Sequence, residues 1–130
     1  MNIDDIACID KVKDDELNIQ VATLCGYKNI YSIFSIAYQK DLLKGTIDNH
    51  VLTIPDYVYD LNAMAELEKN IFTDAVIAER YEKNLMHIVQ WSQSLRTEFS
   101  WAIKASAKQR AEAYVLTMKK EKYERDKGKE

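Results

Sequence analysis

Three segments of the chain repeat apolar residues at the spacing of three and four that is typical of an amphipathic helix. The first covers residues 16–25. Its apolar face consists of Leu17, Val21 and Leu24. Asp14 or Asp15 is expected to cap this helix at its N-terminus. Gly26 is expected to end it, because glycine adopts the left-handed backbone conformation of a helix C-terminus without steric cost.

The second helical segment follows the only proline of the chain, Pro55. Asp60 is a good N-cap for residues 61–72, since its carboxylate can accept hydrogen bonds from backbone N–H groups of the first turn. Its buried face is predicted to consist of Leu61, Met64, Leu67 and Ile71. The residues expected to face solvent are Glu66, Glu68 and Lys69.

The third helical segment begins with a capping box, in which the side chains of Ser106 and Gln109 satisfy two free backbone N–H groups. Small and apolar residues then recur at helical spacing. They are Ile103, Ala107, Ala111, Tyr114 and Met118, with Val115 widening the stripe. This pattern predicts a helix that extends to about Lys122 and is followed by a charged tail.

Between the first and second helices the sequence favours strands. Residues 27–38 are rich in β-branched and aromatic residues, which favour a strand, although so short an apolar run leaves a helix open. Residues 40–50 are interpreted as a connector or hairpin, with Gly45 and Asp48-Asn49 as turn residues. Val51 to Ile54 is expected to be a short extended segment.

Residues 73–101 allow two interpretations. Residues 74–91 can continue as a helix, or residues 84–91 can form a strand that places His87 on an apolar face. In the second case residues 95–101 alternate as its partner strand. The intervening Gln93-Ser94 is a poor two-residue turn because it lacks glycine, so the pattern does not decide between helix and hairpin.

These elements predict an α+β fold with a short, mainly antiparallel sheet and about three helices. A length of 130 residues is most economically one domain, and 47% hydrophobic residues can form its core. We expect an acidic lead-in at residues 1–13, a single domain at residues 14–122 and a charged flexible tail at residues 123–130.

The net charge of −3 is distributed unevenly. Residues 1–103 carry 9 basic and 16 acidic side chains, whereas residues 104–130 carry 9 basic and 5 acidic ones. This balance argues against general nucleic-acid binding, which needs a concentrated positive surface. Neither a membrane span nor a signal peptide is expected, and Cys8 and Cys25 are predicted to be free thiols of a cytoplasmic protein.

Two soft motifs give the chain a resemblance to the phage ABA-sandwich domain, a family of small bacteriophage and prophage proteins. The first motif is carried by Pro55, Tyr57, Asp60, Leu61 and Ala63. The second is carried by Ala105, Ala107, Arg110, Ala111 and Ala113. The resemblance covers residues 17–118 and implies a three-layer α-β-α sandwich, a phage origin and a location in the host bacterial cytoplasm. It implies no activity, and this chain departs from the pattern at Tyr27, where a tryptophan is common.

The motifs of common catalytic and metal sites are missing. His50 and His87 are 37 residues apart and have no ligand partner at metal-binding spacing. Three glycines cannot build a phosphate-binding loop, and no nucleophile motif is present. We therefore expect a protein that is not an enzyme and that holds no metal and no cofactor.

One group of residues remains as a candidate binding site. Aromatic side chains can stack on a base, while basic side chains near a helix N-terminus attract phosphate. The candidate residues are Tyr57, Tyr59, Trp101, Lys104, Lys108 and Arg110. The competing interpretation is that Trp101 packs in the core and the basic residues are solvated.

Two functions follow as hypotheses. The first is a non-enzymatic, phage-encoded counter-defence protein that sequesters a small anionic, nucleotide-type immune signal of the host. The alternative is a protein–protein interaction module that inhibits or adapts a host or phage complex, since eight tyrosines favour interfaces. Both hypotheses include a homo-oligomer and no membrane partner.

Overall fold

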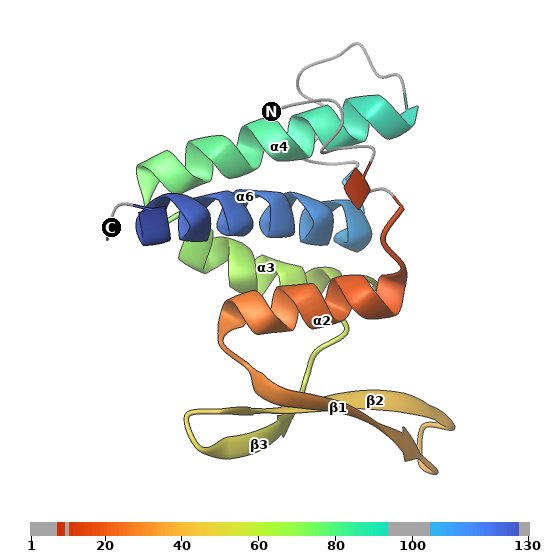
Figure 1. The fold of residues 1–130 in the computed structure, drawn as a ribbon. Coiled ribbons are helices and arrows are strands. Elements are labelled where there is room, and N and C mark those ends of the chain that lie inside the picture. Colours follow the sequence, from red (N-terminus) through yellow and green to blue (C-terminus); the bar gives the residue numbers. More distant parts are fainter. Residues whose placement is uncertain (1–7, 10, 94–104, 128–130) are drawn as a thin grey trace.

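The structure is a computed structural model that describes residues 8–9, 11–93 and 105–127. Its elements, labelled as in Figure 1, follow one another in a simple order. They are α2 (Asp14–Cys25), β1 (Lys28–Ser35), β2 (Lys40–Ile47), β3 (His50–Thr53), α3 (Leu61–Ile71), α4 (Ala75–Gln93) and α6 (Ala107–Lys127). The strands form one antiparallel sheet in the order β1-β2-β3. The predicted α+β class and its antiparallel sheet are confirmed, with four helices in the described part of the chain.

Helix α6 is the centre of the helical part. It contacts α2, α3 and α4, and Figure 1 shows it between α4 on one side and α2 with α3 on the other. The sheet lies beyond α2, so it is an outer layer of the molecule rather than a middle one. Ile30 and Leu43 of the sheet, together with Tyr27 just before β1, pack against the helical core. One face of the sheet therefore meets the helices, and none of the described helices covers the opposite face.

Helix α2 has the predicted apolar face and the predicted C-terminus. Leu17 and Val21 are fully buried, and Gly26 has a φ of 106°. The predicted aspartate cap is wrong, because Asp14 is already helical and Lys13 is the N-cap without a side-chain hydrogen bond. Three acidic residues in the first turn still favour this end of the helix through its dipole.

Helix α3 has the predicted cap. The Asp60 carboxylate accepts hydrogen bonds from the backbone N–H groups of Asn62 and Ala63, at 2.9 and 3.4 Å. Two predicted orientations are wrong: Leu61 is exposed, and Glu68 is largely buried rather than facing solvent. The reason for Glu68 is a tertiary partner, Arg110, which no helical pattern reveals.

Residues 75–93 form helix α4, so the strand interpretation of residues 84–91 is wrong. Tyr81, Leu85 and Ile88 are buried at spacings of four and three, which fits a helix packed along α6. The side-chain amide of Asn84 donates to Thr117 Oγ1 at 2.8 Å and links the two helices. His87 consequently lies on the exposed side of α4, not on an apolar strand face. The predicted partner strand, residues 95–101, lies outside the described residues.

The capping box of α6 is confirmed. The Ser106 backbone N–H donates to Gln109 Oε1 at 2.9 Å, and the Gln109 backbone N–H donates to Ser106 Oγ at 3.1 Å. The helix continues to Lys127, past the predicted end at Lys122 and into the predicted flexible tail. Arg80 of α4 explains this extension, because its guanidinium forms ion pairs with Glu121 and Glu124 of the last turns.

The hairpin interpretation of residues 40–50 is confirmed, with a different role for Gly45. Asp48 and Asn49 form the β2–β3 turn with φ values of 50° and 66°. Gly45 lies in β2 and is not a turn residue. A Cβ atom there would lie 3.2 Å from Ile54 Cδ1 and 3.3 Å from the side chain of Ile30, so a larger residue would have to displace these side chains by a few tenths of an ångström.

A buried asparagine fixes the loop between the sheet and α3. The amide of Asn18 donates to Asp56 Oδ1 at 3.0 Å, and Asn18 Oδ1 accepts from the backbone N–H of Val58 at 3.0 Å. Asn18 thus gives the buried Val58 N–H its hydrogen-bond acceptor and ties Asp56 to α2. The loop in turn positions Tyr57 and Tyr59, two of the predicted site residues.

Candidate functional site

The two tyrosines of the predicted site, Tyr57 and Tyr59, lie in different environments. Tyr57 is buried in the core, and burial raises its pKa. Its hydroxyl shares a small polar cluster with the thiol of Cys25, which lies 3.5 Å from the Tyr114 hydroxyl. Burial also raises the pKa of Cys25. Tyr57 is therefore a core residue, whereas Tyr59 is exposed.

Asp14 brings Tyr59 and Lys108 together. The Tyr59 hydroxyl donates to Asp14 Oδ2, and the ammonium group of Lys108 lies 3.1 Å from Asp14 Oδ1. The hydrogen bond from Tyr59, followed by that from Lys108, lowers the pKa of Asp14. This surface cluster joins the first turns of α2 and α6 to the loop before α3. A carboxylate already occupies the position that an anionic ligand would take.

Arg110 lies in a second, separate cluster with Glu68 and Tyr81. Its Nη1 atom donates to Glu68 Oε2 at 2.8 Å and to Oε1 at 3.1 Å, while its Nε atom donates to the carbonyl of Ala105 at 3.2 Å. The Tyr81 hydroxyl donates to Glu68 Oε2 at 2.7 Å, and burial raises the pKa of Tyr81. This buried network joins α3, α4 and α6, so its first effect is structural.

The other two predicted site residues, Trp101 and Lys104, lie outside the described residues. Of the remaining four, the structure gathers only Tyr59 and Lys108. Both described basic members of the set, Lys108 and Arg110, form ion pairs with carboxylates of the same chain. Because both cations already have carboxylate partners, these residues are less suited to bind an anionic ligand than the sequence pattern predicted.

The sheet presents a different candidate surface. Cross-strand partners lie on the same face of an antiparallel sheet, and Leu43 and Gly45 lie on the face toward the helices. The opposite face carries four apolar side chains, which we call the outer sheet surface. They are Tyr31, Ile33, Leu42 and Val51.

Three of these four side chains are exposed to solvent, and Leu42 is partly buried. An antiparallel sheet with one face on a core normally carries polar residues on its other face. Exposed apolar residues on neighbouring strands mark an interaction surface more often than scattered ones do. The outer sheet surface is therefore the best candidate functional site of the described residues.

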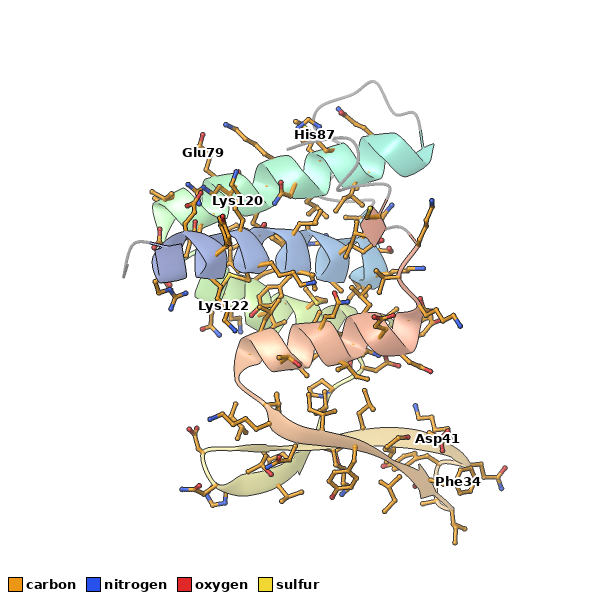
Figure 2. All side chains as sticks on the ribbon, viewed as in Figure 1. Phe34, Asp41, Glu79, His87, Lys120 and Lys122 are labelled. Atoms are coloured by element: carbon orange, nitrogen blue, oxygen red, sulfur yellow. The ribbon has the colours of Figure 1, made fainter. Side chains whose placement is uncertain are left out.

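The apolar character continues toward the end of the β1–β2 hairpin. Phe34, Ile36 and Tyr38 are all exposed. Figure 2 shows Phe34 at the far end of β1, away from the four helices and close to Asp41 of the neighbouring strand. Residues 31–39 contain no charged side chain, although 30% of the chain is charged. This uncharged run is the sequence signal that could have located the surface.

The described residues supply little for other chemistry. No three His, Cys, Asp or Glu side chains among them are placed to hold a metal ion. None of the helices that the structure describes is long and apolar enough to cross a membrane. A shallow, mostly apolar hollow between α2 and α6 is lined by Ile9, Val12 and Leu116, with Gln20 and Lys119 at its polar part.

Comparison of the chain with protein-family models, with curated proteins and with solved structures gave no significant match. The resemblance to the phage ABA-sandwich domain stays a prediction from the residues.

Proposed function

We propose that this protein is a non-enzymatic protein–protein interaction module whose contact surface is the outer sheet surface. The supporting observation is the exposure of Tyr31, Ile33 and Val51 on a sheet face that the described helices leave uncovered. Aromatic side chains such as Tyr31 supply much of the energy of protein interfaces. Under the phage resemblance, the partner is a component of a host or phage complex.

The chemistry of the surface defines the kind of partner. Lys44 and Thr53 lie beside Tyr31 on the same face, so the apolar residues are interspersed with a basic and a neutral polar group. A folded protein that offers an apolar patch with an acidic rim fits this surface best. A highly charged polyanion would gain little from the apolar residues.

The test is retention of a partner by surface variants. The triple variant Tyr31→Ser, Ile33→Thr, Val51→Thr removes the exposed apolar groups and keeps residues that are compatible with strands. The control, Val76→Thr on α4, alters a side chain of matched exposure, 59% against 58% for Val51. Each tagged protein is incubated with bacterial lysate, and a recovered protein is then purified and titrated against all variants.

We expect one protein to bind the wild type and the control in a defined ratio and to lose at least tenfold in affinity for the triple variant. The proposal fails when only the chain itself is recovered. It also fails when the triple variant binds the purified partner as tightly as the control does.

A second candidate function is capture of a small anionic, nucleotide-type ligand. The observation that favours it is the exposed ring of Tyr59 beside Lys108. Such a ligand would have to replace Asp14 as the partner of Lys108. Calorimetry with cyclic nucleotides and ADP-ribose derivatives tests this idea, with Asp14→Asn as the variant that should bind more tightly. Absence of heat for both proteins would exclude this function for these ligands.

A further inference from the structure

We infer that two copies of this chain associate through the free edge of β1, which pairs antiparallel with β1 of the second copy. This inference goes beyond the proposed function, because the strand edge and the outer sheet surface are different surfaces. It rests on four observations about β1: its position, its charge, its side chains and their exposed area.

Strand β1 is at an edge of the sheet. Among the described residues it pairs only with β2, and its eight residues leave one row of backbone N–H and C=O groups facing outward. Proteins usually protect such an edge with charges, a proline, a bulge or a short strand. The one irregularity in β1 lies between Lys28 and Tyr31, so Tyr31–Ser35 remains regular and unprotected.

The opposite edge of the sheet is protected. Strand β3 has only four residues, His50–Thr53, and is followed after Ile54 by Pro55, which has no N–H group to donate. The two edges therefore differ in their ability to accept another strand. Pairing is directed to β1.

The charge of β1 selects a second copy as the occupant. Residues 31–39 carry no charge, so a charged segment would lose solvation there without gaining an ion pair. The segment Tyr31–Ile36 of a second copy is also uncharged and is apolar on both of its faces. A twofold axis perpendicular to the sheet would pair the two identical strands antiparallel and keep each face on its own side.

The exposed area fits a weak dimer. The large apolar side chains near the end of β1 that do not belong to the outer sheet surface are exposed by 60% (Phe34), 85% (Ile36) and 71% (Tyr38). At about 200 Å² for each full side chain, this comes to roughly 430 Å² on each chain. Two chains then supply roughly 860 Å², which is below the range for stable complexes and typical of weak, transient ones. A reversible dimer is expected.

The association also bears on the outer sheet surface. Edge pairing would form one continuous six-stranded sheet, with both copies of Tyr31 and Ile33 on the same face. The dimer would therefore present a partner protein with two outer sheet surfaces side by side. Binding to a dimeric or repetitive partner would gain from this arrangement by avidity.

Sedimentation velocity of the full chain over a concentration series from micromolar to millimolar tests the inference. We expect the mass to rise from 15.1 kDa to twice that value. Phe34→Lys places a charge at the strand edge and leaves the four residues of the outer sheet surface unchanged. It should weaken the dimer at least tenfold. Val76→Lys on α4, with an exposure of 59% against 60% for Phe34, is the matched control and should dimerise like the wild type.

Amide hydrogen exchange of the wild type gives a measurement that needs no variant. Edge pairing predicts that alternate amides of Tyr31–Ser35 exchange more slowly as concentration rises, while amides of α4 do not change. A monomer at all concentrations overturns the inference, as does a dimer that forms without protection of β1 or that Phe34→Lys leaves intact. None of these results touches the proposed function, which depends on the retention of another protein by the outer sheet surface.

Discussion

Replacement of Arg110 by methionine separates a structural role of this residue from a role in ligand binding. Arg110 makes two hydrogen bonds to the Glu68 carboxylate and one to the carbonyl of Ala105. The side chains of Arg110 and Glu68 are only 17% and 12% exposed. Arg110→Met keeps most of the apolar stem but removes the charge. The carboxylate of Glu68 is then left inside the protein with the neutral hydroxyl of Tyr81 as its remaining described donor.

The expected loss follows from this burial. Removing one partner of a buried ion pair costs about 3–5 kcal/mol, because the other charge stays desolvated. The remaining exposure of both side chains places the expected loss at the lower end, about 3 kcal/mol. Lys69→Met is the matched control, since the side chains of its ion pair with Glu66 are 72% and 73% exposed. An exposed pair of this kind contributes about 0–1 kcal/mol.

Urea denaturation followed by circular dichroism measures both free energies of unfolding. The double variant Glu68→Leu, Arg110→Met should recover part of the loss, because it removes the unpaired charge as well. A loss from Arg110→Met no larger than that from Lys69→Met would refute the reasoning. It would mean that solvent screens Glu68, and Arg110 would then regain its place as a candidate ligand-binding residue.

Two further predictions concern the core. Asn18→Ala should lower the free energy of unfolding in urea by about 2 kcal/mol, because it leaves the Val58 N–H buried without an acceptor. Asn18→Asp keeps that acceptor but places a carboxylate against Asp56. If both variants are as stable as the wild type, the role of Asn18 is contradicted. The second prediction follows from burial, which raises the pKa of Tyr57, Tyr81 and Tyr114 above the ordinary value of 10.0. The unfolded chain ionises first, so stability should be full below about pH 10 and should fall as the pH rises, by about 1.4 kcal/mol per pH unit for each tyrosine. Ultraviolet absorbance should show these tyrosines ionising together with unfolding, and gradual ionisation of a folded protein would disprove it.

The sequence was sufficient wherever a signal lies within one or two helical turns. The Asp60 cap, the capping box at Ser106 and the glycine at the end of α2 were all predictable because their partners are at most four residues away. The strand β1 and the turn at Asp48-Asn49 were predictable for the same reason. The α+β class follows from the order of these local signals.

The tertiary structure decided everything that depends on distant partners. Residues 84–91 fit a helix or a strand locally, and their packing along α6 selects the helix. Lys108 and Arg110 looked like equivalent surface cations, yet Asp14 and Glu68, each more than 40 residues away in the chain, engage them in different environments.

Dependence on distant contacts also explains why the sequence alone did not locate the outer sheet surface. The uncharged run from Tyr31 to Gln39 was visible in the sequence, but a strand with apolar residues on both faces is usually buried on both. Only the arrangement of the helices on one side of the sheet shows that, among the described residues, nothing covers the outer face and the β1 edge. Local chemistry fixes which elements form, because capping and turn preferences act over a few bonds. Exposure depends on which elements cover each other, and that is set by contacts across the whole chain.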